Sequence, residues 1–397
     1  MENKEKQYME ETQSHLVHTY NPFPIVVKKG EGVYLYDEEG NKYLDFTSGY
    51  AVSSLGYGNK ELNKKLKAQI DNILHTSNLF YHTAQKEAAE RLLKLCGMDR
   101  LFFTNSGGEA VEGALKAARK YGFEKKSGRY EFIAMKESFH GRSFGALSVT
   151  GHDAYRTPFE PLLAGVKFAA FNDLDSVRAL VNEKTLAIIF EPVQGEGGVY
   201  PAKEEFVKGI RKLCDENDIL MICDEVQCGM GRTGNYFAWQ GYKARPDILT
   251  MAKAIGNGIP VGAFALTEKV AKYSLSPGDH GSTYGGGPLA CTAVSAVAKI
   301  FEKKNLPDHV KEISVYLEEK LDKLKEECPF VTGRRGVGLL QAVKITKQVK
   351  ETTMRALGEG LLVIGAGDDA IRLIPPLVIE KEHVDEMIEK LKKALEA

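Results

Sequence analysis

The sequence lacks any long apolar run. Its longest uninterrupted apolar stretches hold about half a dozen residues, whereas a membrane-spanning helix needs roughly 18. The first 13 residues are rich in Glu and Lys and contain no apolar core of a secretion signal. An excess of one charge is also absent, because 53 Lys and Arg residues oppose 54 Asp and Glu residues. We therefore expect a cytoplasmic protein that binds neither nucleic acid nor membranes.

Cysteine is scarce and shows no pairing pattern. The six cysteines form no CxxC pair, and no His-x-x-His partner accompanies them; they are Cys96, Cys214, Cys223, Cys228, Cys291 and Cys328. Most of them lie inside apolar or helical patterns, which predicts buried, reduced thiols. We expect no disulfide framework and no metal site.

The composition is that of an ordinary globular protein. At roughly 150 residues per domain, 397 residues predict two to three domains with a sizeable core. Only glycine departs from the average, since its 39 residues are about 10% of the chain against the usual 7% or so. Many places where the backbone turns sharply or approaches a ligand closely are expected.

Short apolar runs alternate with helical patterns through the middle of the chain. The runs are Leu101–Phe103, Phe132–Met135, Val166–Ala169, Leu186–Phe190, Ile219–Cys223 and Val261–Leu266. Because they are continuously apolar, they predict strands covered on both faces. Lys203–Asn217 carries apolar residues at helical spacing between the fourth and fifth runs, which predicts a right-handed βαβ unit. The sequence thus predicts an α/β fold with a parallel sheet and flanking helices.

The ends of the chain predict smaller elements. An Ala-rich helix is expected over Pro288–Lys304 and an amphipathic helix over Pro307–Cys328, after which a smaller C-terminal domain begins. That domain is expected to contain strands around Gly338–Ile345, Leu361–Ile364 and Ile371–Ile374 and a closing helix over Val384–Leu395. Near the other end, Val33–Tyr36 and Tyr43–Phe46 predict a hairpin.

A glycine turn follows the first predicted strand. Asn105–Ala110, with the sequence NSGGEA, lies between Leu101–Phe103 and a helical pattern. Free backbone N–H groups at a helix start, with a dipole of about +0.5 charge, form a site for a phosphate. An ordinary Ser N-cap in a βα loop explains the same residues equally well.

A second glycine motif, Gly229–Gly234, matches the GxGxxG pattern of dinucleotide sites. Its context does not fit, because Asp224–Gln227 separates it from the preceding strand. In addition, Asn235–Trp239 has no amphipathic period that would open a helix. A nicotinamide site here stays as an alternative that the surroundings disfavour.

Two charged residues stand in apolar surroundings. Asp224 follows the strand Ile219–Cys223, at the sheet edge where open parallel sheets bind ligands. A carboxylate in these surroundings needs a cationic partner or dense hydrogen bonding, and a salt bridge to an arginine is the simplest way to meet this need. Lys253 is the only charged residue in Thr250–Pro260. Burial lowers the pKa of an amine and lets it attack a carbonyl, although a lysine whose head reaches water is the commoner case.

These three features share one explanation. An anion-binding helix start, an acid at a strand end and a secluded lysine are the attachments that pyridoxal phosphate requires for its phosphate, ring nitrogen and aldehyde.

From about Tyr20 to the C-terminal helix, the chain resembles the class III (subgroup II) pyridoxal-phosphate aminotransferases. Within them it is most similar to the enzymes that act on N-acetylornithine in arginine biosynthesis. The matching strings are His75–Asn78, Asn105–Ala110, Phe139–Arg142, Glu191–Gly198, Asp224–Gly234, Ala252–Ala254 and Gly281–Gly286. The resemblance implies the fold type I of pyridoxal-phosphate transferases, an α/β fold with a mostly parallel central sheet in its large domain. It divides the chain into an N-terminal segment (1–45) that packs with the small domain, a large cofactor-binding domain (46–300) and a small C-terminal domain (301–397).

The resemblance also implies roles for individual residues. Lys253 would form the Schiff base with the cofactor, and Asp224 would bind the pyridinium nitrogen. The other cofactor-binding residues would be Ser106, Gly107 and Gly108 on the phosphate, Thr283 on the phosphate from a neighbouring subunit, Phe139 and Val226 on the ring faces, Gln227 near the phenolic oxygen, and His140. The substrate-binding residues would be Arg142 on the α-carboxylate, the pair Glu196 and Arg372, Tyr50 and Ser282. A homodimer with active sites at the subunit interface is implied.

Some residues depart from the family pattern. Gly286-Gly287-Pro288 stands where the family usually has Gly-Gly-Asn-Pro, and Gly56–Lys60 stands where it has Gly-His-x-His-Pro. Tyr50 is typical of ornithine aminotransferases, whereas Phe139-His140 and His75–Asn78 favour the acetylornithine group. The expected reaction moves the δ-amino group of N2-acetyl-L-ornithine to 2-oxoglutarate.

Several alternatives remain open at this point. Within the same fold they are ornithine, succinylornithine and 4-aminobutyrate transaminases and aminomutases. From other classes, they are a nicotinamide oxidoreductase that uses Gly229–Gly234 and a non-catalytic protein of the same fold.

The two substrates make different demands on one pocket. The reacting end of the first donor is neutral, whereas 2-oxoglutarate brings two carboxylates. Our hypothesis is that Glu196 neutralises Arg372 in the first half-reaction and moves away in the second, while Arg142 holds the distal carboxylate.

Overall fold

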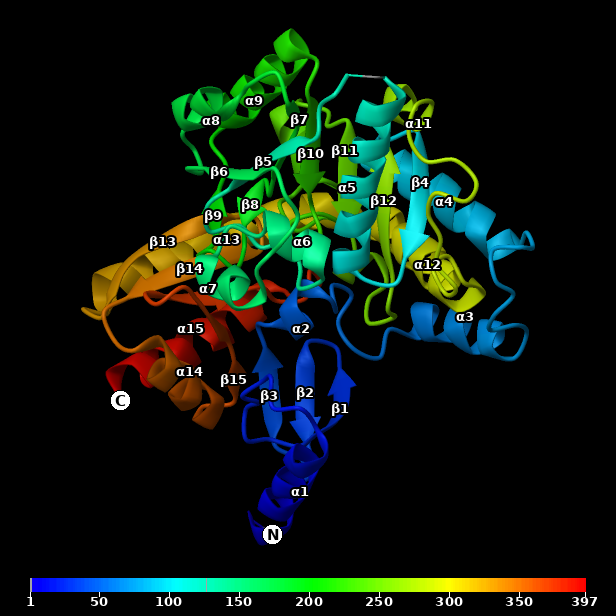
Figure 1. Cartoon of the computed structure of the whole chain (residues 1–397). Coiled ribbons are helices and arrows are strands. Elements are labelled where there is room, and N and C mark those ends of the chain that lie inside the picture. Colours follow the sequence, from blue (N-terminus) through cyan, green and yellow to red (C-terminus); the bar gives the residue numbers. More distant parts are fainter. Residues whose placement is uncertain (1, 126) are drawn as a thin grey trace.

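The computed structural model describes residues 2–125 and 127–397. A seven-stranded sheet forms its centre, in the order β4-β12-β11-β10-β7-β5-β6 (Figure 1). The strands are β4 (Arg100–Thr104), β5 (Glu131–Met135), β6 (Val166–Ala169), β7 (Thr185–Phe190), β10 (Leu220–Asp224), β11 (Ile248–Met251) and β12 (Gly262–Leu266). All six apolar runs of the middle segment therefore form strands, as predicted, and β11 joins them.

The sheet is mixed rather than wholly parallel. β7 and β10 are parallel neighbours on either side of α9 (Glu204–Asn217) in the chain, which confirms the predicted strand–helix–strand unit. β12, however, runs antiparallel to both β4 and β11. The expectation of a parallel sheet is wrong for this strand. Its sequence, GAFAL, is apolar throughout, and full burial produces the same pattern in either direction.

Helices cover both faces of this sheet. Alternate residues of β7 and β10 contact two different cores: Ile188 and Met221 pack in one, and Ile189 and Ile222 in the other. The first core includes α9, α4 and α12, and the second includes α5. Burial on both faces explains the continuous apolar runs.

Three smaller sheets complete the fold of the described residues. One has the order β1-β2-β3-β15 and joins the predicted hairpin to a C-terminal strand, which pairs parallel to β3. A second has the order β13-β14-β17-β16, and a third pairs β8 with β9. Their bounds are β1 (Val27–Glu31), β2 (Tyr34–Asp37), β3 (Lys42–Asp45), β8 (Val193–Gln194), β9 (Tyr200–Pro201), β13 (Val331–Val337), β14 (Leu340–Ile345), β15 (Leu361–Leu362), β16 (Ile364–Ala366) and β17 (Ala370–Leu373). The division of the chain into domains at residues 45 and 300 stays a prediction.

Clear start and stop signals delimit the long helices. α12 (Pro288–Lys304) has Pro at its first position and ends at Asn305 in the left-handed conformation. α13 (Leu306–Glu327) and α15 (Lys381–Glu396) confirm the two other C-terminal helices that were expected. The remaining helices are α1 (Glu2–His15), α2 (Ser48–Ala51), α3 (Lys60–Ile70), α4 (Thr83–Cys96), α5 (Gly107–Glu124), α6 (Phe144–Val149), α7 (Asp153–Arg156), α8 (Leu174–Leu180), α10 (Ala238–Tyr242), α11 (Glu268–Ala271) and α14 (Val349–Gly358), with short 3-10 turns η1 (Thr157–Phe159) and η2 (Lys253–Ile255).

All six cysteines are free and buried, as predicted. Among the described residues, none of the helices is both long and apolar enough to cross a membrane.

Candidate active site

Loops at one edge of the central sheet surround a cavity of about 320 Å³. The carboxyl ends of the parallel strands meet at this edge. Ser106 follows β4, His140 follows β5, Asp224 ends β10 and Lys253 follows β11. The predicted residues that line the cavity are Ser106, Gly107, Gly108, Phe139, His140, Glu196, Asp224, Val226, Gln227 and Lys253.

Asp224 is buried and fully hydrogen-bonded. Its Oδ2 lies 2.7 Å from Nδ1 of His140, and its Oδ1 accepts hydrogen bonds from the Thr250 hydroxyl (2.9 Å) and the Val226 N–H (3.1 Å). The partner of this carboxylate is thus a histidine rather than the arginine of the simplest explanation. Burial by itself lowers the pKa of His140, but the hydrogen bond and charge of Asp224 outweigh it and raise that pKa. The shift favours the protonated, positively charged form of His140 next to Asp224.

Lys253 is held in an unusual backbone conformation. Its φ is +49°, a left-handed value that residues other than glycine rarely adopt. Burial lowers the pKa of its amine, although Glu196 and Asp224 act in the opposite direction. A lysine with a lowered pKa supplies more of the neutral, nucleophilic amine. Strain of this kind concentrates at functional sites.

The start of α5 lies at the cavity wall. Ser106 is the N-cap, and its hydroxyl accepts a hydrogen bond from the Glu109 N–H at 3.2 Å. The Ser N-cap and the anion site are therefore compatible, because the cap uses the amide of Glu109 while Gly107 and Gly108 line the cavity. A Cβ atom on Gly107 would lie 2.7 Å from the Val226 side chain. Only glycine fits this close approach.

An ion pair stands beside the cavity. Arg372, which is only 2% exposed, donates hydrogen bonds from Nη1 and Nη2 to the two carboxylate oxygens of Glu196 at 2.9 and 3.1 Å. Nη1 also donates to Oε1 of Gln227 at 3.3 Å. Burial alone would raise the pKa of Glu196, but Arg372 outweighs it and lowers that pKa. The ring of Tyr50 lies 5.5 Å from the Arg372 guanidinium.

Other predicted residues do not line the cavity in a single chain. Arg142 is exposed, and its guanidinium lies over the rings of Tyr155 (3.8 Å) and Phe139 (5.3 Å). Thr283 is exposed as well. Ser282 accepts a hydrogen bond from the side chain of Asn105 at 3.1 Å, which places it one residue behind the cavity wall.

Two residues of this site were not predicted from the sequence. Glu191 lines the cavity and accepts a hydrogen bond from the Phe139 N–H at 3.0 Å. Burial raises its pKa to about 7. Glu191 follows the apolar strand β7 as Asp224 ends β10, so the argument applied to Asp224 would have found it. Thr250, which binds Asp224, lies inside β11, and no sequence signal singles it out.

The cavity fits pyridoxal phosphate. It provides a helix start whose glycine admits no side chain, a carboxylate held by a histidine, and a lysine of lowered pKa. Phe139 and Val226 supply an aromatic and an apolar wall. Its volume is at the lower end of the roughly 300–1,000 Å³ typical of ligand sites.

Comparisons with known proteins agree with this chemistry. The family model "Aminotransferase class-III" matches residues 16–395. The acetylornithine aminotransferase of Clostridium acetobutylicum is 46% identical over 95% of this chain and 98% of its own length. That of Aquifex aeolicus is 43% identical over 96% of this chain and 100% of its own length.

Two solved structures are similar in fold. The ornithine aminotransferase from Toxoplasma gondii superimposes with a TM-score of 0.94 at 29% identity, covering 98% of this chain and 94% of its own. The acetylornithine aminotransferase from Elizabethkingia anophelis gives a TM-score of 0.87 at 31% identity, covering 98% of each chain. With a family match over nearly the whole length and a cavity that suits the cofactor, the chain belongs to the class III aminotransferases, which depend on pyridoxal phosphate.

Proposed function

We propose that this enzyme transfers the δ-amino group of N2-acetyl-L-ornithine to 2-oxoglutarate, giving N-acetyl-L-glutamate 5-semialdehyde and L-glutamate. The relatives named acetylornithine aminotransferase, at 43–46% identity over nearly the full length, support this substrate. The geometric observation that carries the proposal is the Glu196–Arg372 pair beside Lys253. The same pocket must bind first the neutral reacting end of the donor and then a carboxylate of 2-oxoglutarate. It therefore needs an arginine whose charge a neighbouring carboxylate can neutralise.

Residues of the cavity divide the work of holding the cofactor. Ser106, Gly107 and Gly108 would hold the phosphate, Asp224 the ring nitrogen, Phe139 and Val226 the ring faces, and Gln227 the phenolic oxygen. When bound, pyridoxal phosphate supplies an aldehyde that condenses with amines and a ring that accepts electron density.

His140 holds Asp224 in place through the hydrogen bond between its Nδ1 and Oδ2 of Asp224. Asp224 would in turn bind the ring nitrogen of the cofactor through its side chain.

Lys253 has two tasks in the reaction. Its ε-amino group would hold the cofactor. With a donor bound, Nζ would remove the proton from the δ-carbon of the donor, because burial lowers the pKa of the amine and so increases the share of its neutral, basic form. Arg142 orients the donor through its α-carboxylate with the planar fork of the guanidinium.

In the second half-reaction, 2-oxoglutarate replaces Glu196 on Arg372. The Glu196 side chain is 30% exposed, so it has room to leave, whereas Arg372 is fixed by burial. Arg142 then binds the distal carboxylate.

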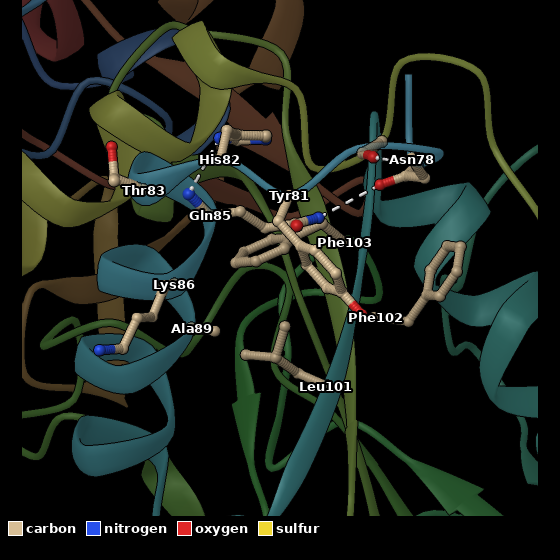
Figure 2. A pocket seen from close by; sticks show the side chains of 11 residues that line it. Asn78, Tyr81, His82, Thr83, Gln85, Lys86, Ala89, Leu101, Phe102 and Phe103 are labelled. Carbon is tan, nitrogen blue, oxygen red and sulfur yellow. Dashed lines mark hydrogen bonds between the residues drawn. The ribbon is translucent and has the colours of Figure 1, made fainter. Parts of the chain in front are cut away.

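A second copy of the chain is expected to complete the site. A surface around residues 74–81 exposes Leu74, Leu79, Phe80 and Tyr81, and Tyr284 lies exposed nearby, with its ring 5.2 Å from that of His75. This surface adjoins a cavity of about 660 Å³ between α4 and β4, in which Figure 2 shows Tyr81 in front of Phe103 and the Asn78–Gln85 hydrogen bond. Apolar patches of this kind mark interfaces. Asn78 also donates to the carbonyls of Ser282 and Gly285, which ties the exposed loop of Thr283 to this surface.

The homodimer would let Thr283 of one subunit reach the phosphate site of the other. Light scattering of the wild type and of Tyr81→Glu tests this assignment: we expect a dimer and a monomer of reduced activity, respectively. A fully active monomeric wild type would contradict it.

Steady-state kinetics on a donor panel tests the substrate. We expect kcat/KM for N-acetylornithine to exceed that for ornithine, succinylornithine and 4-aminobutyrate. Ornithine is the second candidate donor, because the ring of Tyr50, a residue typical of ornithine aminotransferases, lies against Arg372. A higher kcat/KM for ornithine would replace the proposed donor.

A further inference from the structure

The segment that presents Tyr50 has a strained backbone. Four consecutive residues, Ser48 to Ala51, have φ values of +40°, +61°, +63° and +66°. Only one of them, Gly49, is a glycine. In L-residues this conformation brings Cβ close to the following carbonyl oxygen, and left-handed residues normally occur singly. Contacts from outside the turn must therefore hold it.

Asp45, the last residue of β3, provides such contacts. Its side chain is completely buried. Oδ1 accepts hydrogen bonds from the Thr47 N–H (2.8 Å), the Thr47 hydroxyl (2.7 Å) and the Ser48 N–H (3.0 Å). Oδ2 accepts one from the Tyr57 hydroxyl at 2.6 Å. One carboxylate thus fixes the entrance of the turn, and Tyr57 orients that carboxylate.

The same turn is tied to the segment that carries Arg372. The Ser48 hydroxyl donates to the carbonyl of Ile374 at 2.6 Å, and the Ile374 N–H donates to the carbonyl of Phe46 at 2.8 Å. Ile374 is two residues beyond Arg372. These hydrogen bonds place the Tyr50 ring 5.5 Å from the Arg372 guanidinium.

We propose that Asp45 is a positioning residue for substrate binding. Its carboxylate holds residues 48–51 in the left-handed turn and so keeps Tyr50 against Arg372, where the α-carboxylate of 2-oxoglutarate binds. The inference rests on the proposed function for the identity of this ligand. Asp45 itself touches neither substrate nor cofactor.

Two glycines offer a matched pair of variants. A Cβ on Gly49 would lie no closer than 3.9 Å to another atom, so Gly49→Ala has room and acts through the φ of +61°. Gly40, in the turn between β2 and β3, has a φ of +89° and open space around it. Gly40→Ala therefore imposes a comparable backbone penalty far from Arg372 and serves as the control.

The assay measures kinetics and equilibrium binding on the cofactor-loaded enzyme. We expect Gly49→Ala to raise the KM for 2-oxoglutarate about fivefold and to change kcat less than twofold, since only uniform binding is weakened. The Kd of glutarate, an unreactive dicarboxylate, should rise by a similar factor in calorimetry. Gly40→Ala should lower the melting temperature to a similar extent and change neither constant.

Substitutions of Asp45 itself form the second part of the test. Asp45→Ala should raise both constants about tenfold, and Asp45→Asn, which keeps an oxygen acceptor for the turn, should recover most of the loss. If Gly49→Ala leaves KM and the glutarate Kd as unchanged as Gly40→Ala does, the positioning role is overturned, even when Asp45→Ala fails to fold. If the wild type does not turn over N-acetylornithine, the proposed donor falls while the glutarate measurements still decide the role of Asp45.

Discussion

Removal of the Glu196 carboxylate should change which amino donor the enzyme prefers. In Glu196→Ala, Arg372 loses two charge-assisted hydrogen bonds at 2.9 and 3.1 Å and keeps the hydrogen bond to Gln227 at 3.3 Å. Breaking a fully buried ion pair costs about 3–5 kcal/mol. Because Glu196 is 30% exposed, we expect about 2 kcal/mol.

The freed guanidinium then attracts the α-carboxylate of glutamate in the first half-reaction. About 2 kcal/mol corresponds to roughly a 30-fold rise in the ratio of kcat/KM for glutamate to that for N-acetylornithine. Stopped-flow half-reactions with each donor measure this ratio directly. Asp308→Ala, which removes an exposed ion pair with Lys311, is the control and should leave the ratio unchanged. A folded Glu196→Ala enzyme with the wild-type ratio would refute the masking of Arg372 by Glu196.

Three further predictions concern the cavity. Asp224→Ala should lose about 10²–10³-fold in kcat, because the ring nitrogen of the cofactor would lose its carboxylate partner, and Asp224→Glu should lose less; turnover equal to the wild type in both would exclude Asp224 from the ring nitrogen. Lys253→Met should abolish turnover but raise the urea midpoint of the cofactor-free protein, since it removes an amine whose pKa burial lowers; a lower midpoint would contradict this burial cost. Burial raises the pKa of Glu191 from 4.5 to about 7, so the folded state binds a proton that the unfolded state has lost. The stabilisation by protonated Glu191 is therefore complete below pH 4.5 and is lost as the pH rises through 7. Between pH 5 and pH 8, the free energy of unfolding should fall less for Glu191→Gln than for the wild type. An equal fall in both proteins would argue against a raised pKa of Glu191.

The sequence predicted the central sheet well because its strands are buried on both faces. Continuous apolar runs mark such strands, but they carry no sign of direction, so the antiparallel β12 was not foreseen. β13 was missed for the opposite reason: its sequence, VTGRRGV, is polar and half-exposed. It is a strand because it pairs antiparallel with β14, and no local sequence pattern predicts this pairing.

The site residues that could be predicted are those with a local signal. Asp224 ends an apolar strand, Lys253 is alone among apolar residues, and Ser106 opens a helix after a strand. The hydrogen bond from Thr250 to Asp224 and the contact of Tyr50 with Arg372 join residues far apart in the chain. Only the folded backbone brings them together, and neither composition nor spacing encodes these contacts.

Reduction of the cofactor-loaded enzyme with borohydride, followed by peptide mass spectrometry, shows directly whether Lys253 carries the cofactor. We expect visible absorption before reduction and a single pyridoxyl group on the peptide that contains Lys253, with both signals lost in Lys253→Ala. A pyridoxyl group on a different lysine, or none on any peptide, would contradict this expectation.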